Sequence, residues 1–233
     1  MAASPDSRGL AAALLLAAGS GERLGAGGPK ALVPLAGRPM YEFSLNAFRT
    51  AGRIGPILIA VPPGRAGDFA DAGDATLVEG GAARSLSVAN ALAALDAGDS
   101  DCDLVAVHDA ARPLVDPELI DSAVELLEAS PGVDAVIAAA PVTDTVKRVG
   151  AGGLVKQTLD RSKLRAVQTP QVFRRASLAE AIAAGEPENA TDDASLIEAA
   201  GGSVVVIDSP SFNIKVTVRE DLAIAEARIA DRD

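Results

Sequence analysis

The sequence contains one cysteine and one histidine, and both scarcities limit the chemistry open to it. A single cysteine, Cys102, excludes a disulfide within the chain and fits a reducing cytoplasm. It stands between acidic residues just before an apolar run, where we expect it to pack without reacting. The one histidine, His108, invites a role as general base, but its place at the end of that run favours a packed residue of the fold.

Positive charge is also scarce. The chain has 21 Lys and Arg against 32 Asp and Glu, a formal net charge of −11. Non-specific nucleic-acid binding depends on an excess of cations, so we expect no nucleic-acid partner. An acidic chain that binds polyanions must concentrate its few cations locally, which makes each cationic cluster informative.

Long apolar runs are few, and the first of them needs a choice between two interpretations. Residues 10–18 follow Arg8 and imitate the core of a signal peptide, but they are too short to span a bilayer. Asp6 precedes the run, and a glycine-rich loop follows it directly. The alanine content would also suit a helix. We predict the buried first strand of a parallel sheet, a cytoplasmic location and no membrane contact.

Strand and helix patterns alternate along most of the 233 residues, of which 48% are hydrophobic and 23% charged. Further strands are predicted at 56–61, 75–78, 104–107, 134–139, 204–207 and 214–216, and helices at 40–50, 85–94, 117–129, 175–184, 192–200 and from 219 onward. This alternation predicts an α/β fold with an open, mainly parallel, Rossmann-like sheet and helices on both faces. We expect a single domain over 1–233, with residues 1–9 as a flexible tail and ligands bound at the carboxyl ends of the strands.

The alternation breaks between Pro141 and Pro170. Two segments with period-2 patterning, 142–149 and 154–159, flank the glycine-rich turn 150–153. That pattern is typical of a β-hairpin. We therefore predict a protruding β-arm over 141–165, serving either as a lid or as a dimerisation arm.

A glycine-rich loop with two cations follows the first strand. It reads AAGSGERLG from Ala17 to Gly25 and continues to Lys30. Glycines lack a Cβ, so consecutive N–H groups can turn toward one anion, and Arg23 and Lys30 suit a polyphosphate. The spacing fits neither the dinucleotide fingerprint nor the P-loop. By itself the loop leaves open an ordinary turn with solvated charges.

Other polar clusters also fall at predicted strand ends. Asp109 follows a buried strand, where its carboxylate can contact a substrate hydroxyl or help to hold Mg²⁺ through water. The structural alternative is a carboxylate that caps a helix. In the cluster at 80–87, Ser85 is a plausible helix cap. The remaining clusters lie at 144–147, 161–171, 191–195 and 213–217.

In chain order, the motifs are A-A-G-x-G-x-R, P-K, G-G-x-x-R-x-x-S-V, H-D-A-A-R-P, D-T-x-K, L-x-R, T-P-Q-x-F, T-D-D-A-S and N-I-K-V-T. Together they resemble the 2-C-methyl-D-erythritol 4-phosphate cytidylyltransferase family of the non-mevalonate isoprenoid pathway, over nearly the whole chain. The glycine loop is shared by many nucleotidyltransferases, whereas H-D-A-A-R-P and the order of the blocks are more specific. The chain ends soon after its last helix, so we expect no fused second enzyme of the pathway.

The resemblance implies a Mg²⁺-dependent homodimeric enzyme that transfers a cytidylyl group from CTP to methylerythritol phosphate and releases pyrophosphate. Ribitol-5-phosphate cytidylyltransferase is the nearest alternative. A dinucleotide-binding oxidoreductase lacks support because the third glycine of its fingerprint is missing. A non-catalytic nucleotide-binding module is disfavoured by the intact Arg23 and Lys30.

The resemblance also implies site residues, carried over position by position. Arg23, Lys30, Arg161 and Lys215 match catalytic cations; Ala17, Ala18, Gly19, Gly81 and Ser87 match positions around CTP; Asp109, Arg112, Thr145, Arg161 and Lys215 match positions that hold the polyol phosphate. In the family the arm pairs with that of a second subunit, so Thr145 and Arg161 would serve the partner's site. The family often has an acidic residue where Ala82 stands. The resemblance therefore does not carry a side-chain contact to the ribose over to this position. The metal's ligands stay open, with Asp109 as one candidate.

The implied reaction accounts for the scarcity of histidine and cysteine. Its nucleophile, a phosphate oxygen, is already an anion at neutral pH and needs no general base. What the reaction requires is that two polyanions be brought together and that charge on phosphorus be stabilised. Local cations supply that, even in an acidic chain.

Overall fold

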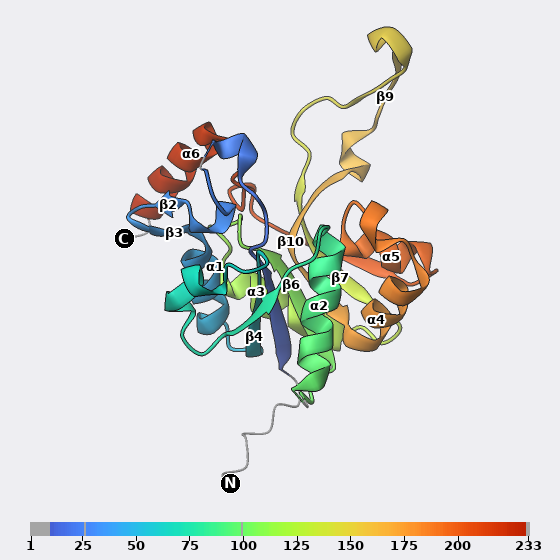
Figure 1. Ribbon diagram of the computed structural model, residues 1–233. Coiled ribbons are helices and arrows are strands. Elements are labelled where there is room, and N and C mark those ends of the chain that lie inside the picture. The colour runs from blue at the N-terminus through green and yellow to red at the C-terminus, as the bar shows by residue number, and fades with distance from the viewer. Residues whose placement is uncertain (1–9, 26, 99, 232–233) are drawn as a thin grey trace.

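The computed structural model describes residues 10–25, 27–98 and 100–231, so the tail predicted at 1–9 lies outside the described residues. A seven-stranded sheet runs through the molecule in the order β11-β7-β10-β6-β1-β4-β5 (Figure 1). Its strands are β1 (Ala11–Leu16), β4 (Ile54–Val61), β5 (Thr76–Glu79), β6 (Leu104–Asp109), β7 (Ala135–Pro141), β10 (Arg165–Arg174) and β11 (Val204–Asp208). All neighbouring strands pair in parallel except β10, which is antiparallel to β6 and β7. The predicted open, mainly parallel sheet is confirmed.

Strand β10 is the element that the sequence analysis missed. It contains the polar run from Gln168 to Gln171 with Pro170 in its middle, and proline is rare inside a central strand because it cannot donate to the ladder. The structure accommodates the proline at a register shift between Val167 and Gln171, where pairing with β7 is interrupted.

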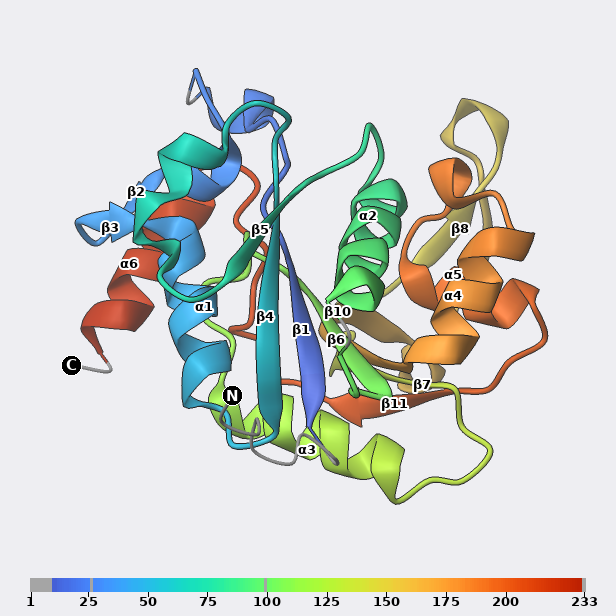
Figure 2. The ribbon, with the colours of Figure 1, turned by 60° about the horizontal axis from the view of Figure 1, so that its bottom comes forward.

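Helices cover both faces of the sheet, as predicted (Figure 2). They are α1 (Met40–Thr50), α2 (Arg84–Ala97), α3 (Pro117–Glu128), α4 (Arg175–Ala184), α5 (Asp193–Ala199) and α6 (Arg219–Ala230). Side chains alternate along β1, so Ala13 and Leu15 pack with α1 and α3 on one face, and Ala12 and Leu14 pack with α2, α4 and α5 on the other. Cys102 is buried in the second of these cores, which confirms its packing role. Within the described ranges, no helix combines the length and apolar content needed to cross a bilayer.

A third, smaller core fixes the glycine-rich loop to the end of the chain. Leu24 of that loop packs with Leu35, next to the short pair β2 (Pro34–Leu35) and β3 (Arg38–Pro39). Val216, which precedes α6, and Ala225 of α6 belong to the same cluster. The last helix therefore supports the loop that carries the first two predicted cations.

Two local predictions are wrong. Residues 214–216 form no strand: the Val216 N–H donates to the Ala111 carbonyl at 2.8 Å, and this bond ties an irregular segment to the loop after β6. Ser85 does not cap α2, because the cap position is Ala83 and no side chain bonds to the helix end there. By contrast, Asp116 does cap α3, because its side chain accepts from the Glu118 N–H.

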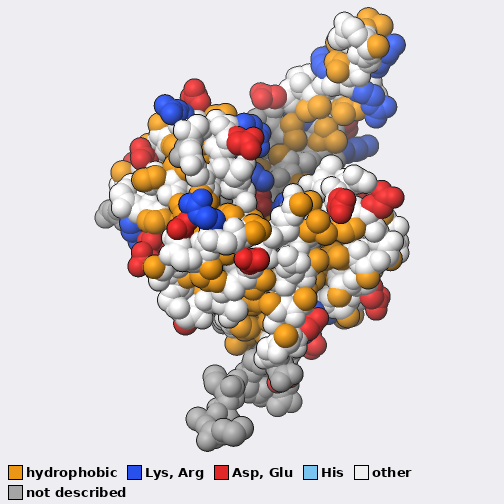
Figure 3. Space-filling view, in the orientation of Figure 1, with side chains coloured by type: hydrophobic (Ala, Val, Ile, Leu, Met, Phe, Trp, Pro, Cys, Tyr) orange, Lys and Arg blue, Asp and Glu red, His pale blue; other side chains and the backbone are white. Residues whose placement is uncertain are grey.

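The predicted β-arm projects away from the rest of the molecule (Figure 1). Its two strands, β8 (Lys147–Val149) and β9 (Val155–Thr158), pair only with each other in the described structure. Val149, Leu154 and Val155 each have more than half of their surface exposed. Residues 141–165 carry six cations against two acids, and the space-filling view shows Lys and Arg gathered along the projection (Figure 3).

Candidate active site

A cavity of about 620 Å³ opens at the carboxyl ends of β1, β5 and β6. The glycine-rich loop, the segment before α2 and the segment before α6 form its walls. Predicted residues that line it are Ala17, Ala18, Gly19, Arg23, Lys30, Gly81, Ser87, Asp109 and Lys215. Ligands of open parallel sheets bind at this edge, so the location matches the prediction.

The glycine-rich loop needs its small residues to take this shape. Gly21 has φ +74°, and a Cβ there would lie 2.9 Å from the Gly28 carbonyl oxygen. The Lys30 N–H donates to the Gly19 carbonyl at 2.9 Å, which closes the loop. At Gly19 a Cβ would have no neighbour within 4 Å, so its backbone faces open space that a ligand can enter.

On the opposite wall, glycines let the segment before α2 approach β1. A Cβ at Gly80 would lie 2.6 Å from the Ala18 Cβ. The Gly81 N–H donates to the Ser87 hydroxyl at 3.0 Å, and that hydroxyl donates to the Ala83 carbonyl at 3.2 Å. The CTP-binding positions predicted on these two walls therefore face one cavity.

Cations converge on the cavity from distant parts of the chain. Arg23 and Lys30 come from the first loop, and Lys215 comes from the segment before α6. Burial, together with repulsion from Lys215 and Arg23, lowers the pKa of Lys30 to about 8. Repulsion among like charges is relieved when an anion binds, so this arrangement favours a phosphate-bearing ligand.

Asp109 is the centre of an ion-pair network on the cavity floor. Its two carboxylate oxygens accept from Arg84 Nε at 3.0 Å and from Lys215 Nζ at 2.7 Å. Burial raises the pKa of Asp109, but Arg84 and Lys215 outweigh it and hold that pKa well below its usual range. Arg84 also pairs with Asp193, whose side chain is fully buried.

Sequence reasoning missed Arg84 and Asp193 as members of the site. Arg84 lines the cavity, and Asp193 lies behind it at the start of α5. Both stand in motifs that had been singled out, G-G-x-x-R and T-D-D-A-S. The signal was therefore present, but not the pairing between residues so far apart in the chain.

His108 is a packed residue, as expected. Its side chain is fully buried, lies against the Phe48 ring at 5.2 Å between centroids, and has a pKa that burial lowers to about 3. Arg112 is half-buried and does not line the cavity; its guanidinium donates to the Asn213 carbonyl at 2.8 Å.

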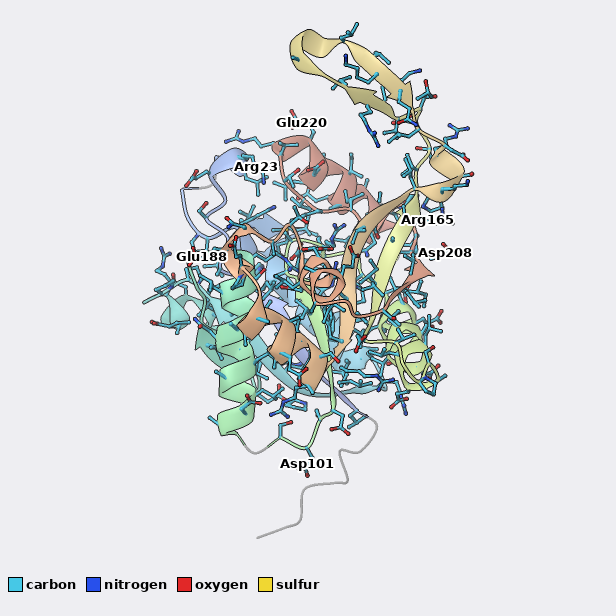
Figure 4. The ribbon with its side chains drawn as sticks, turned by 90° about the vertical axis from the view of Figure 1, so that its right-hand side faces the viewer. Arg23, Asp101, Arg165, Glu188, Asp208 and Glu220 are labelled. Carbon is cyan, nitrogen blue, oxygen red and sulfur yellow. The ribbon has the colours of Figure 1, made fainter. Side chains whose placement is uncertain are left out.

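Thr145 and Arg161 lie on the exposed arm, away from the cavity of their own chain. Arg161 bonds to the Thr143 carbonyl within the arm. At the arm's base, Arg165 Nε lies 3.7 Å from an Asp208 carboxylate oxygen (Figure 4). The same view shows the arm and the loop bearing Arg23 at the same end of the molecule, on opposite sides.

The described residues contain no group of three or more His, Cys, Asp or Glu side chains placed to hold a metal ion. The carboxylates at the cavity are Asp109, both of whose oxygens are already paired, and Glu22 on the loop. Mg²⁺ commonly takes one or two carboxylates and completes its shell with water and substrate phosphates. This donor set fits a metal ion that is held mainly by the ligand's phosphates.

The doubly wound sheet, the cationic glycine-rich loop and the cavity at the strand ends define an α/β protein of the nucleotidyltransferase type. The family model IspD, described as 2-C-methyl-D-erythritol 4-phosphate cytidylyltransferase, matches residues 11–231. The chain belongs to this family.

Individual relatives agree with that assignment. A protein of Frankia casuarinae named 2-C-methyl-D-erythritol 4-phosphate cytidylyltransferase is 46% identical over 225 residues, covering 95% of this chain and 82% of that protein. A crystal structure of the Thermus thermophilus protein of the same name is 35% identical, with a TM-score of 0.78, and covers 95% of this chain and 99% of that one. A 4-diphosphocytidyl-2C-methyl-D-erythritol synthase from Anaerococcus prevotii has 28% identity and a TM-score of 0.81, covering 97% of this chain and 100% of that one.

Proposed function

We propose that this protein transfers a cytidylyl group from CTP to 2-C-methyl-D-erythritol 4-phosphate and releases pyrophosphate, in the non-mevalonate route to isoprenoid precursors. The observation that carries the proposal is the convergence of Arg23, Lys30 and Lys215 on one cavity in a protein with a net charge of −11. The relatives named above act, by their names, on methylerythritol phosphate, so ribitol 5-phosphate is not the favoured acceptor.

The nucleotide occupies the wall formed by the first loop and the start of α2. Ala17, Ala18 and Gly19 offer backbone groups with little side chain to obstruct the ligand, and Gly81 and Ser87 face them across the cavity. Ala82 has no polar side chain, so contact to the ribose in this region depends on backbone groups. The triphosphate extends toward Arg23 and Lys30.

The reaction is an in-line displacement at phosphorus. An oxygen of the acceptor phosphate forms a bond to the α-phosphorus of CTP, and the bond from that phosphorus to the bridging oxygen of pyrophosphate breaks. Lys30 and Arg23 stabilise the charge that grows on the five-coordinate phosphorus and on the leaving group. No proton has to be removed from the attacking phosphate, which is already ionised, so the buried, neutral His108 is not required as a base.

The acceptor binds beside the nucleotide. Asp109 accepts hydrogen bonds from the polyol hydroxyls, and Lys215 and Arg112 attract its phosphate. Thr145 and Arg161 complete this subsite in trans, from the arm of a second copy. We therefore propose a homodimer formed through residues 141–165, with each chain serving as a single nucleotidyltransferase domain in the cytoplasm.

Mg²⁺ is the proposed cofactor. When bound, it neutralises charge on the triphosphate and helps pyrophosphate to leave. The substrate phosphates would hold it, and Asp109 would help to hold it through water.

A coupled assay of pyrophosphate release tests the function. CTP with methylerythritol phosphate is expected to give turnover that depends on added Mg²⁺, whereas CTP with ribitol 5-phosphate is expected to give little. Preferential turnover of ribitol 5-phosphate would establish the alternative acceptor. Binding of CTP without pyrophosphate release from either acceptor would instead indicate a nucleotide-binding module.

A further inference from the structure

The proposed acceptor subsite is backed by hydrogen bonds through two buried side chains, His108 and Thr169, that do not line the cavity. The Asp109 backbone N–H donates to the Thr169 hydroxyl oxygen at 3.1 Å. That hydroxyl lies 3.0 Å from His108 Nδ1, and His108 Nε2 lies 3.2 Å from the Arg112 carbonyl oxygen. His108 is 0% exposed and Thr169 is 3% exposed, so water does not substitute for any of these partners.

The donors and acceptors of this chain can be assigned in one consistent way. A carbonyl oxygen only accepts, so the Arg112 carbonyl requires a proton on His108 Nε2. A neutral imidazole then has a lone pair at Nδ1, which accepts the single hydroxyl proton of Thr169. The hydroxyl oxygen remains free to accept from the Asp109 N–H. Every donor and acceptor named in this hydrogen-bond chain is thereby satisfied.

A second route leads from the same threonine to the side chain of Arg112. The Thr169 carbonyl accepts from Asn213 Nδ2 at 2.9 Å, and the Asn213 carbonyl accepts from the Arg112 guanidinium at 2.8 Å. Thr169 therefore constrains both the backbone and the guanidinium of Arg112. It belongs to β10, the antiparallel strand inserted beside β6.

We propose that Thr169 and His108 are positioning residues that hold Asp109 and Arg112 in register for the acceptor, whose hydroxyls Asp109 contacts and whose phosphate Arg112 attracts. Neither of them lines the cavity, so they act through the two residues that they hold. This inference rests on the proposed function for its kinetic consequence, whereas the hydrogen-bond chain can be tested without any substrate. The CTP positions on the opposite wall have no hydrogen bond to Thr169 among the described contacts, which separates the two substrates in a kinetic test.

Because His108 is the chain's one histidine, its imidazole can be observed without ambiguity in a long-range ¹H–¹⁵N spectrum of the full chain freed of any histidine tag. We expect the neutral tautomer with the proton on Nε2 at neutral pH. A proton on Nδ1 would leave an Nε2 lone pair facing the Arg112 carbonyl oxygen, which would break the hydrogen-bond chain at that contact and overturn the inference, whether or not the protein turns over any substrate.

A matched pair of variants supplies the kinetic test. Thr169→Val keeps the shape but removes the hydroxyl, whereas Thr169→Ser keeps the hydroxyl. We expect Thr169→Val to raise the KM for methylerythritol phosphate about tenfold or more, with the KM for CTP changed less than about twofold, and Thr169→Ser to stay close to the parent. Thr50→Val, at an exposed helix end, is the control for the substitution itself.

Equal rises in both KM values, or equal damage from Thr169→Val and Thr169→Ser, would overturn the positioning role. If Thr169→Val does not fold, His108→Gln and His108→Asn replace it. The longer glutamine amide can reach the Arg112 carbonyl as Nε2 does, so glutamine is expected to keep a lower KM for the acceptor than asparagine. Failure of the parent protein to use methylerythritol phosphate would reject the proposed function alone. The imidazole spectrum tests the hydrogen-bond chain separately, because it needs no substrate.

Discussion

The cavity and the β-arm differ in how their predicted site residues are held: Asp109 in the cavity is buried and paired, whereas the residues on the arm are exposed. In the cavity, Asp109 is buried and paired on both oxygens, and its neighbours are fixed by glycine-lined turns and core packing. On the arm, Thr145 and Arg161 are exposed, and β8 and β9 pair only with each other among the described strands. The cavity is thus preorganised within one chain, whereas the arm is exposed in the described structure. This difference agrees with the proposal that one chain binds the nucleotide and that a second copy completes the acceptor subsite.

The strongest test of the preorganised cavity is Lys30→Ala. We expect turnover to fall by about 10²–10³-fold, the scale of losing one preorganised group that stabilises charge in the transition state. Pyrophosphate release at saturating CTP and acceptor measures it. Arg65→Ala removes an exposed cation outside the cavity and is expected to leave turnover unchanged. Near-normal turnover of Lys30→Ala would contradict the proposed role.

The support behind the cavity can be broken at Asp193. Asp193→Ala removes a fully buried partner of Arg84, and we expect the free energy of unfolding to fall by about 3 kcal/mol because the guanidinium loses a desolvated counter-charge. Asp74→Ala breaks the ion pair with Arg49 at a carboxylate that is 89% exposed, and it is expected to change stability little. Urea unfolding of both variants measures the contrast. Equal losses would show that burial does not distinguish the two pairs.

The arm is tested by mixing two impaired variants. Arg161→Ala is expected to lower turnover by about tenfold or more, because a charged contact to the acceptor phosphate is lost. Mixing it with Lys30→Ala forms hybrid dimers in which one site is intact. At equal amounts, activity should recover to about a quarter of the parent value, since half of the dimers are hybrids with one working site each. Hybrids that form but stay inactive would reject a site shared between subunits.

The pH dependence of kcat/KM for CTP tests a single charge in the preorganised cavity, that of Lys30. As the pH rises through about 8, the free protein's Lys30 loses its proton and with it the attraction for the triphosphate. We therefore expect kcat/KM for CTP to fall toward tenfold per pH unit above that value. Lys30→Arg keeps its charge and should move this limb to higher pH. An unchanged limb in Lys30→Arg would assign the titration to another group.

Much of the site could be predicted because its parts are local. The apolar run before the glycine loop and the H-D-A-A-R-P block each carry their strand, turn and polar groups within a few residues. The family resemblance assigned Arg23, Lys30 and Lys215 to one site, and the structure brings these three residues to one cavity. The roles assigned to these residues remain proposals.

The errors arose where the local pattern and the tertiary environment disagree. In β10, Pro170 and its polar neighbours oppose a strand, yet the segment is central, because pairing with β6 and β7 and buried partners for Gln168 and Thr169 compensate for the proline. At 214–216 the apolar alternation imitates a strand, but Val216 is used to anchor a loop and Lys215 to pair with Asp109.

The alternation of strands and helices, the glycine-rich, cationic composition of the first loop and the separation of the arm can be read from the sequence, because each depends on residues that are neighbours in the chain. Tertiary packing, by contrast, makes Arg84 join Asp109 to Asp193, which lies 109 positions after Arg84, and makes the one histidine link Thr169 to Arg112. These pairings depend on the strand order and on the insertion of one antiparallel strand, which bring distant segments to the same edge of the sheet. No local pattern encodes that order, since it minimises the free energy of the whole packed sheet.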